Sequence, residues 1–290
     1  MPTTARKRVL TVEPIAPAMG VEVAGVDLVE VASNDDLFAE IHQLWLEHKL
    51  LVFRGQALPP AEHVRLAERF GPLESHPIQP SHADYPALLL IHRQEERTTY
   101  ENVWHADATF RARPPIGAVL KCEDCPPVGG DTMWANMAMA YDRLPERIKE
   151  RIGSLRAKHS IEHSFGGTMT PERRAVLAAE FPPAEHDVVL QHPDTGDPVL
   201  YVNQGFTTHF VNFQRFDRVR NGLDFTVEAN HLMNYLLTQA TIPEYQVRVR
   251  WRPGTVAIWD NRSTQHYAIH DYWPQPRAMS RATITAGNSD

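Results

Sequence analysis

The sequence lacks several features that would each indicate a particular class of protein. It has only two cysteines among 290 residues, and two thiols cannot complete a four-thiolate zinc site. It has no run of 18 or more apolar residues, so we expect neither a membrane-spanning helix nor a membrane partner. Neither a glycine-rich dinucleotide fingerprint nor a phosphate-binding loop occurs. Any catalytic or binding site in this chain must therefore be of another kind than a four-thiolate zinc site, a dinucleotide fold or a phosphate-binding loop.

Basic charge is also scarce. The 29 lysines and arginines are outnumbered by 36 acidic residues, which gives a formal net charge of -7. A nucleic-acid binder usually carries a basic surface, so we expect no nucleic-acid partner. The charged N-terminus is not followed by the apolar stretch of a secretory signal, which predicts a cytoplasmic protein. Cys122 and Cys125 precede a Pro-Pro and Gly-Gly stretch typical of a strand entering a loop, and we interpret them as structural thiols in a reducing compartment.

The length and the 42% apolar content are sufficient for one large domain over residues 1–290. Apolar residues at helical spacing predict helices at residues 34–49, 60–70, 137–155, 171–180 and 226–240. Short apolar or alternating stretches predict strands at residues 50–53, 199–202, 247–251 and 255–259. These elements do not follow a regular βαβ order, and the sequence contains no internal repeat.

Two short segments far apart in the chain carry candidate metal ligands. In Trp104-His105-Ala106-Asp107 the histidine and the aspartate are two residues apart, and a β-strand would place both side chains on one face. The second segment ends at His266 and reads Trp259-Asp260-Asn261-Arg262-Ser263-Thr264-Gln265-His266. An H-x-D pair alone is a weak signal in a chain with 15 histidines. With His266 from a distant strand, it would form the facial triad of non-haem Fe(II) oxygenases, which leaves positions open for a cosubstrate and dioxygen.

At these two segments, and in particular at Asn261-Arg262-x-x-x-His266, the chain resembles the TauD/TfdA family of Fe(II)- and 2-oxoglutarate-dependent dioxygenases. The likeness continues at residues 20–28, 53–56, 70–71, 129–132 and 202–208. For the fold, the resemblance implies an α+β protein with a mainly β core, namely a double-stranded β-helix (jelly roll) flanked by helices. For the cofactors, it implies Fe(II), 2-oxoglutarate as cosubstrate, and dioxygen.

The resemblance also assigns roles at the metal and the cosubstrate. His105, Asp107 and His266 match the family's iron ligands, and they supply two nitrogens and one hard oxygen. Arg277, eleven residues beyond His266, matches the arginine whose guanidinium grips the distal carboxylate of 2-oxoglutarate. Thr132 matches a hydroxyl that assists at the same carboxylate.

For the primary substrate, the resemblance implies a binding site with a second arginine and an aromatic wall. Arg281 matches the position that binds the anionic head of the substrate, and His76 matches a histidine that helps to hold the same anion. Phe110 and Phe206 fall where the family lines its substrate pocket, and Phe165 is a third candidate. Aromatic residues inside a barrel also pack as ordinary core, so this alternative stays open.

One stretch departs from the taurine-type pattern. Counted back from His105, Glu101 falls where those enzymes place an asparagine, whereas a shift of one residue would bring Asn102 there. A carboxylate at this position would pair with a substrate ammonium or exclude a second anionic group. Taurine is therefore one candidate among several.

Together these residues predict a dioxygenase that hydroxylates a small anionic substrate and releases succinate and carbon dioxide. The candidates are taurine or another alkyl sulfonate, an alkyl sulfate, and an aryloxyalkanoate. The same chemistry on an amino-acid-like biosynthetic substrate, by hydroxylation or desaturation, is the main alternative. A zinc hydrolase with the same three ligands and a non-catalytic jelly-roll binding protein are more remote. Members of the resembled family also form homodimers or homotetramers, and either is compatible with the sequence.

Overall fold

The computed structural model describes residues 10–75, 80–93, 101–213 and 226–287. Its helices are α1 (Leu28–Val31), α2 (Asp35–His48), α3 (Pro60–Glu68), α4 (Met137–Asp142), α5 (Glu146–Ile152), α6 (Ile161–Phe165), α7 (Pro171–Glu180) and α8 (Val227–Leu237). Short 3-10 turns follow at Gly166–Thr168, Thr238–Thr241 and Pro243–Tyr245. In the described part of the chain, no helix has the length and apolar character needed to cross a membrane.

The larger sheet runs in the order β1-β2-β3-β14-β6-β16-β4, and β5 also pairs with β16. Only the β2–β3 pair is parallel; the other pairs of this sheet are antiparallel. The strands are β1 (Thr11–Pro14), β2 (Val21–Ala24), β3 (Leu50–Phe53), β4 (Leu73–Glu74), β5 (Leu88–Arg93), β6 (Gly117–Asp124), β14 (Val256–Asp260) and β16 (Arg277–Ile284).

A second, three-stranded sheet faces the larger one and has the order β13-β7-β15. Its strands are β13 (Gln246–Val249), β7 (Thr132–Asn136) and β15 (Thr264–Ala268). Leu50 and Val52 of β3 share one buried cluster with Trp134 of β7 and Val247 of β13, so the two sheets pack face to face. The predicted jelly roll is thereby confirmed.

Helices α2 and α3 cover the outer face of the larger sheet. Because side chains alternate along a strand, Leu51 and Phe53 of β3 point away from the neighbouring Leu50 and Val52. They join Ile41 and Trp45 of α2 in a separate buried cluster. Both faces of β3 are therefore buried, which explains its unbroken apolar sequence Leu-Leu-Val-Phe.

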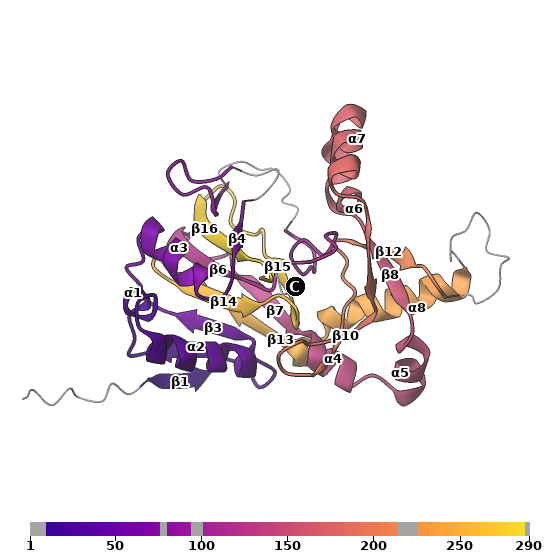
Figure 1. Ribbon diagram of the computed structural model, residues 1–290, viewed down its shortest axis with the longest axis horizontal. Coiled ribbons are helices and arrows are strands. Elements are labelled where there is room, and N and C mark those ends of the chain that lie inside the picture. Colours follow the sequence, from indigo (N-terminus) through magenta and orange to yellow (C-terminus); the bar gives the residue numbers. More distant parts are fainter. Residues whose placement is uncertain (1–9, 76–79, 94–100, 214–225, 288–290) are drawn as a thin grey trace, which may run out of the picture.

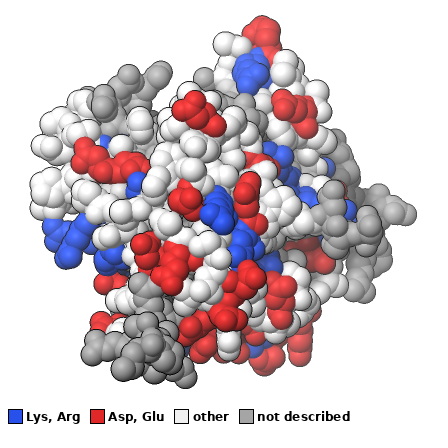
Figure 2. All heavy atoms as spheres, turned by 60° about the vertical axis from the view of Figure 1, so that its left-hand side comes forward, with Lys and Arg blue, Asp and Glu red and all other residues white. Residues whose placement is uncertain are grey.

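A second group of elements lies to the right of the two sheets in Figure 1. It contains β8 (Arg156–His159), β9 (Ala184–Asp187), β10 (Val189–Gln191), β11 (Pro198–Leu200) and β12 (Thr207–Phe210). Helices α4, α5 and α8 pack there through a further apolar cluster, while α7 projects at the top of the view. Figure 2 shows acidic and basic side chains interspersed over one face of the molecule.

Most predicted elements lie close to their expected positions, and one helix is divided. The helix predicted at residues 34–49 is α2, with the Asn34 side chain accepting a hydrogen bond from the Leu37 amide at its first turn. The prediction of one continuous helix over residues 137–155 is wrong, because α4 ends at Asp142 and α5 begins after Pro145. A proline disfavours helical backbone at the residue before it, so the pattern cannot continue as one helix.

Candidate metal and cosubstrate site

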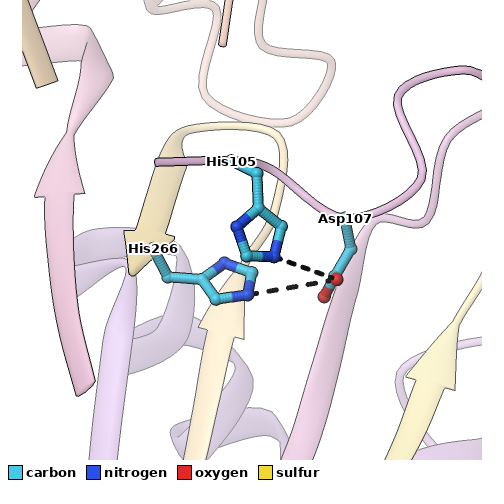
Figure 3. Close-up of side chains that lie close together, drawn as sticks. All are labelled: His105, Asp107 and His266. Atoms are coloured by element: carbon cyan, nitrogen blue, oxygen red, sulfur yellow. Dashed lines mark ion pairs between the residues drawn. The ribbon is translucent and has the colours of Figure 1, made fainter. Parts of the chain in front are cut away.

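Three predicted ligands meet in the structure. The Nε2 atoms of His105 and His266 each lie 3.9 Å from Oδ1 of Asp107, and one ligand atom from each residue fits within 4.8 Å of the others. All three residues are buried. Figure 3 shows both imidazole rings and the carboxylate turned toward one another. Among the described residues this is the only such group of three potential ligands.

Main-chain pairing holds the two histidines together. His266 lies on β15, opposite Trp134 of β7. His105 forms an isolated antiparallel bridge with His266, with hydrogen bonds of 3.0 Å and 2.7 Å between their main-chain N and O atoms. This bridge brings segments far apart in the sequence into contact.

The prediction that His105 and Asp107 share one strand is wrong. Pairing stops at His105, and Asp107 begins a turn in which Ala108 has a φ of 48°, a value that non-glycine residues rarely adopt. The carboxylate reaches the side of His105 through this turn rather than through strand alternation.

Each histidine turns its Nε2 toward the carboxylate of Asp107. Nδ1 of His105 donates to the Val103 carbonyl at 2.7 Å, which fixes the orientation of the ring and leaves Nε2 for a metal. Burial, reinforced by His105, lowers the pKa of His266 to about 3, so its imidazole is neutral at physiological pH. Its ring stacks on Trp134 and lies against Trp259. Neutral imidazoles are the form that binds metal ions.

Asp107 is ionised despite its burial. Burial alone would raise the pKa of Asp107, but the Arg281 guanidinium holds it at about 2. Nη1 of Arg281 donates to Oδ1 at 2.9 Å and to Oδ2 at 3.0 Å. Two imidazole nitrogens and one carboxylate oxygen that lie within 4.8 Å of one another fit Fe(II), and they also suit zinc.

Arg277 and His266 both line a cavity of about 560 Å³ that opens to solvent; we call it the Arg277 cavity. Nε of Arg277 donates to the Gly130 carbonyl at 3.0 Å, and its Nη2 lies 3.4 Å from Oγ1 of Thr132. Burial lowers the pKa of Arg277, and no carboxylate of the described residues forms an ion pair with it. A buried guanidinium without an acidic partner is suited to a carboxylate ligand.

The predicted aromatic residues line a second cavity, of about 640 Å³, which His105 and Asp107 also line; we call it the Phe206 cavity. Phe110, Phe165 and Phe206 all contribute to its wall. They also pack on one another, with ring centroids of Phe110 and Phe206 5.2 Å apart. Both interpretations, pocket wall and packed core, therefore apply to the same rings.

Arg281 and Glu101 line both cavities. Asn102 is exposed and lines neither, so the structure brings Glu101 rather than Asn102 to the cavities, and a role of Glu101 at the substrate stays a prediction. His76 lies outside the described residues. His270 lines the Arg277 cavity together with Tyr272.

The comparison with known proteins decides between the metals. A family model described as "Taurine catabolism dioxygenase TauD, TfdA family" matches residues 11–283. The chain belongs to this family. Like the rest of the TauD/TfdA family it is an Fe(II)- and 2-oxoglutarate-dependent dioxygenase, which excludes the zinc hydrolase and the non-catalytic alternatives.

Several relatives of this TauD/TfdA chain have named activities. It is 36% identical to an alkylsulfatase of Acinetobacter baylyi, over 95% of this chain and 84% of that protein. It is 34% identical to an alpha-ketoglutarate-dependent sulfate ester dioxygenase of Pseudomonas putida, over 95% of this chain and 89% of that protein. The solved structure of a taurine dioxygenase from Burkholderia xenovorans has a TM-score of 0.78 and 30% identity, covering 96% of this chain and 91% of that one. The single-domain organisation, the oligomeric state and the cytoplasmic location of this TauD/TfdA protein stay predictions.

The sequence did not predict a buried ionic network beside the ligands. Asp260 accepts from Nε and Nη2 of Arg262, both at 3.0 Å, and from Nε2 of His192 at 2.7 Å. Arg262 also pairs with the half-exposed Asp194 at 2.6 Å. In the sequence, Asp260 and Arg262 were identified only as parts of the motif that resembles the family. The contact of His192 with Asp260 could not be predicted, because the two residues are about 70 positions apart.

We expect Asp260→Asn to lower the free energy of unfolding by about 3 kcal/mol, because it leaves Arg262 buried with an incomplete partner. Burial alone would raise the pKa of Asp260, but the hydrogen bonds from His192 and Arg262 hold it below its ordinary value. This stabilisation is therefore present above about pH 4 and is lost as the pH falls through the folded-state pKa. Urea unfolding of both proteins from pH 7 to pH 3 measures it.

The matched control is Asp194→Asn, which removes the half-exposed partner of the same arginine. This variant should lower the free energy of unfolding by less than about 1 kcal/mol. Equal losses in the two variants, or an unchanged acid dependence in Asp260→Asn, would contradict the assignment.

Proposed function

We propose that this dioxygenase hydroxylates the carbon that bears the ester oxygen of a small alkyl sulfate. One atom of dioxygen enters the C–H bond and the other enters succinate, as 2-oxoglutarate loses carbon dioxide. The hydroxylated carbon then carries both a hydroxyl and a sulfate group. Its C–O bond to sulfate breaks as the hydroxyl loses a proton, which gives an aldehyde and inorganic sulfate.

In this proposal His105, Asp107 and His266 hold Fe(II), which supplies, with 2-oxoglutarate and dioxygen, the oxidant for the C–H bond. The distal carboxylate of 2-oxoglutarate binds Arg277, whose Nε is already fixed on the Gly130 carbonyl. Thr132, whose Oγ1 lies 3.4 Å from Nη2 of Arg277, lines the same cavity and would lie beside the cosubstrate.

The substrate proposal is based on an unsatisfied hydrogen-bond donor of Arg281. Its Nη1 is occupied by Asp107, but its Nε is buried and has no hydrogen-bond partner among the described residues. A buried N–H donor without an acceptor is costly, and a sulfate oxygen would supply that acceptor. Arg281 also lines the Phe206 cavity, whose aromatic wall suits an alkyl chain. The names of two relatives, an alkylsulfatase and a sulfate ester dioxygenase, support this choice of anion.

A second candidate is favoured by Glu101. Its carboxylate side chain lies at the wall shared by the two cavities, where it would pair with the ammonium of an aminoalkyl sulfonate such as taurine. The two candidates differ in their products, because a sulfonate releases sulfite and a sulfate ester releases sulfate.

The test is succinate formation by anaerobically iron-loaded protein, exposed to dioxygen and 2-oxoglutarate with one anion at a time. The panel holds an alkyl sulfate and an alkyl sulfonate of equal chain length, taurine, an aryloxyalkanoate and an amino acid. We expect the alkyl sulfate to stimulate succinate formation, with sulfate and aldehyde formed in equal amounts. Stimulation by taurine with sulfite release would select the second candidate. Equal succinate across the panel would reject both.

Arg281→Ala should raise the KM for the alkyl sulfate roughly 10- to 100-fold, because a charge-assisted hydrogen bond contributes about 1.5–3 kcal/mol. The KM for 2-oxoglutarate should change far less, since Arg277 binds that carboxylate. If both KM values rise equally, the proposed division between the two arginines is wrong.

A further inference from the structure

The metal-ligand segment is attached to the second ligand segment at two places. The first is the main-chain bridge between His105 and His266. The second is the side chain of Asn261, which reaches the main chain of Asp107 from the end of β14. Each attachment holds one of the two ligands contributed by the H-x-D segment.

Asn261 forms a two-way bridge to Asp107. Its Oδ1 accepts from the Asp107 amide at 2.7 Å, and its Nδ2 donates to the Asp107 carbonyl at 3.0 Å. Nδ2 also donates to the Pro115 carbonyl at 2.9 Å. An amide that faces one N–H donor and two carbonyls has only one satisfactory orientation, so these contacts fix the side chain.

This side-chain bridge takes the place of main-chain strand pairing, which Asp107 lacks. Two main-chain bonds in opposite directions are what a residue in an antiparallel ladder exchanges with its partner. Asp107 has left the ladder and begins the turn that contains Ala108 with its positive φ. The Asn261 amide supplies the same pair of bonds at the point where the backbone departs from regular structure.

Asn261 is itself rigidly held. It is 1% exposed, and its main-chain amide donates to the Ile116 carbonyl at 3.0 Å. Its neighbours Asp260 and Arg262 belong to the buried ionic network described above. The bridge therefore connects Asp107 to a fixed part of the sheet.

We propose that Asn261 is a positioning residue for the iron site, which it serves by fixing the main chain of Asp107 so that the carboxylate meets the two imidazoles. The proposal rests on the assignment of His105, Asp107 and His266 as the metal ligands. Loss of groups that orient a metal ligand typically weakens metal binding 10- to 100-fold. We expect a loss of that size when Asn261 is truncated, with the three ligands unchanged.

The experiment compares the Fe(II) dissociation constants of wild type, Asn261→Ala, Asn136→Ala and His105→Ala, measured anaerobically by equilibrium dialysis. Asn136 is the matched control. It is also a buried asparagine with three side-chain hydrogen bonds, from the Ala138 and Met139 amides and to the Ala18 carbonyl, but it contacts no ligand. Urea unfolding of each metal-free variant reports the general loss of stability, and the Co(II) absorption spectrum reports the ligand geometry.

Asn261→Ala should raise the Fe(II) dissociation constant 10- to 100-fold and alter the Co(II) spectrum, while Asn136→Ala loses similar stability but keeps the wild-type dissociation constant and spectrum. A wild-type constant and spectrum in Asn261→Ala would overturn the proposal. Iron binding in His105→Ala equal to wild type would instead show that the ligand assignment itself is wrong. If Asn261→Ala does not fold, Asn261→Asp serves in its place, because it keeps the acceptor for the Asp107 amide and replaces the donor with an oxygen that faces two carbonyls.

Discussion

Asp107→Ala should abolish stoichiometric iron binding and reduce 2-oxoglutarate-dependent succinate formation to the level without protein. The carboxylate is the only oxygen ligand of the group, and Arg281 holds it ionised beside the two imidazoles. Without it, two imidazoles and a nearby guanidinium remain, which is a poor site for a divalent cation. Metal content after anaerobic loading and single-turnover succinate yield measure the two effects.

Glu22→Gln is a suitable control for the loss of a carboxylate that pairs with an arginine. Glu22 lies on β2 and pairs with Arg54 at 2.9 Å, away from both cavities. This variant should bind iron and form succinate as the wild type does. Retained 2-oxoglutarate-dependent turnover in Asp107→Ala would refute the proposed triad.

The second large effect is expected in the binding of 2-oxoglutarate. Arg277→Ala should raise the KM for 2-oxoglutarate roughly 100-fold, because the paired hydrogen bonds from a buried guanidinium to a carboxylate contribute about 3 kcal/mol. Truncation also leaves the Gly130 carbonyl without its donor and removes one of the two arginines that line the cavity. Initial rates over a wide range of 2-oxoglutarate concentration give the KM directly.

Arg277→Lys separates charge from geometry. A lysine keeps the positive charge but cannot form the paired contacts of a guanidinium, so its KM should lie between those of wild type and Arg277→Ala. Iron binding without 2-oxoglutarate should be unchanged in both variants. A wild-type KM in Arg277→Ala would remove Arg277 from the cosubstrate site.

The parts of the molecule that could be predicted from sequence are those in which nearby residues decide the structure. Asn34 caps α2, and the apolar run of β3 is buried on both faces. The strands predicted at residues 247–251 and 255–259 correspond to β13 and β14. The resemblance to TauD/TfdA proteins then supplied the roles that these patterns alone do not specify.

The parts that could not be predicted depend on contacts between distant segments. The turn at Asp107 is stabilised by Asn261, more than 150 residues later, and no local spacing reveals that pair. His192 joins Asp260 in the same way. The substrate side of the site was predicted least completely, because Glu101 and Asn102 are adjacent and only the three-dimensional arrangement shows which of them reaches the cavities.

The separation of the ligands along the chain has a consequence for folding. His105 and Asp107 precede His266 by roughly 160 residues, so a bound ion closes a very long loop and acts as a reversible cross-link. The unfolded chain would lose much conformational freedom on closing a loop of that length, and it offers no preformed site. Iron therefore binds the folded chain preferentially, and every increase in occupancy adds to the free energy of unfolding. On the proposed ligand assignment, the bound ion therefore also stabilises the fold, because it joins two segments that are far apart in the sequence.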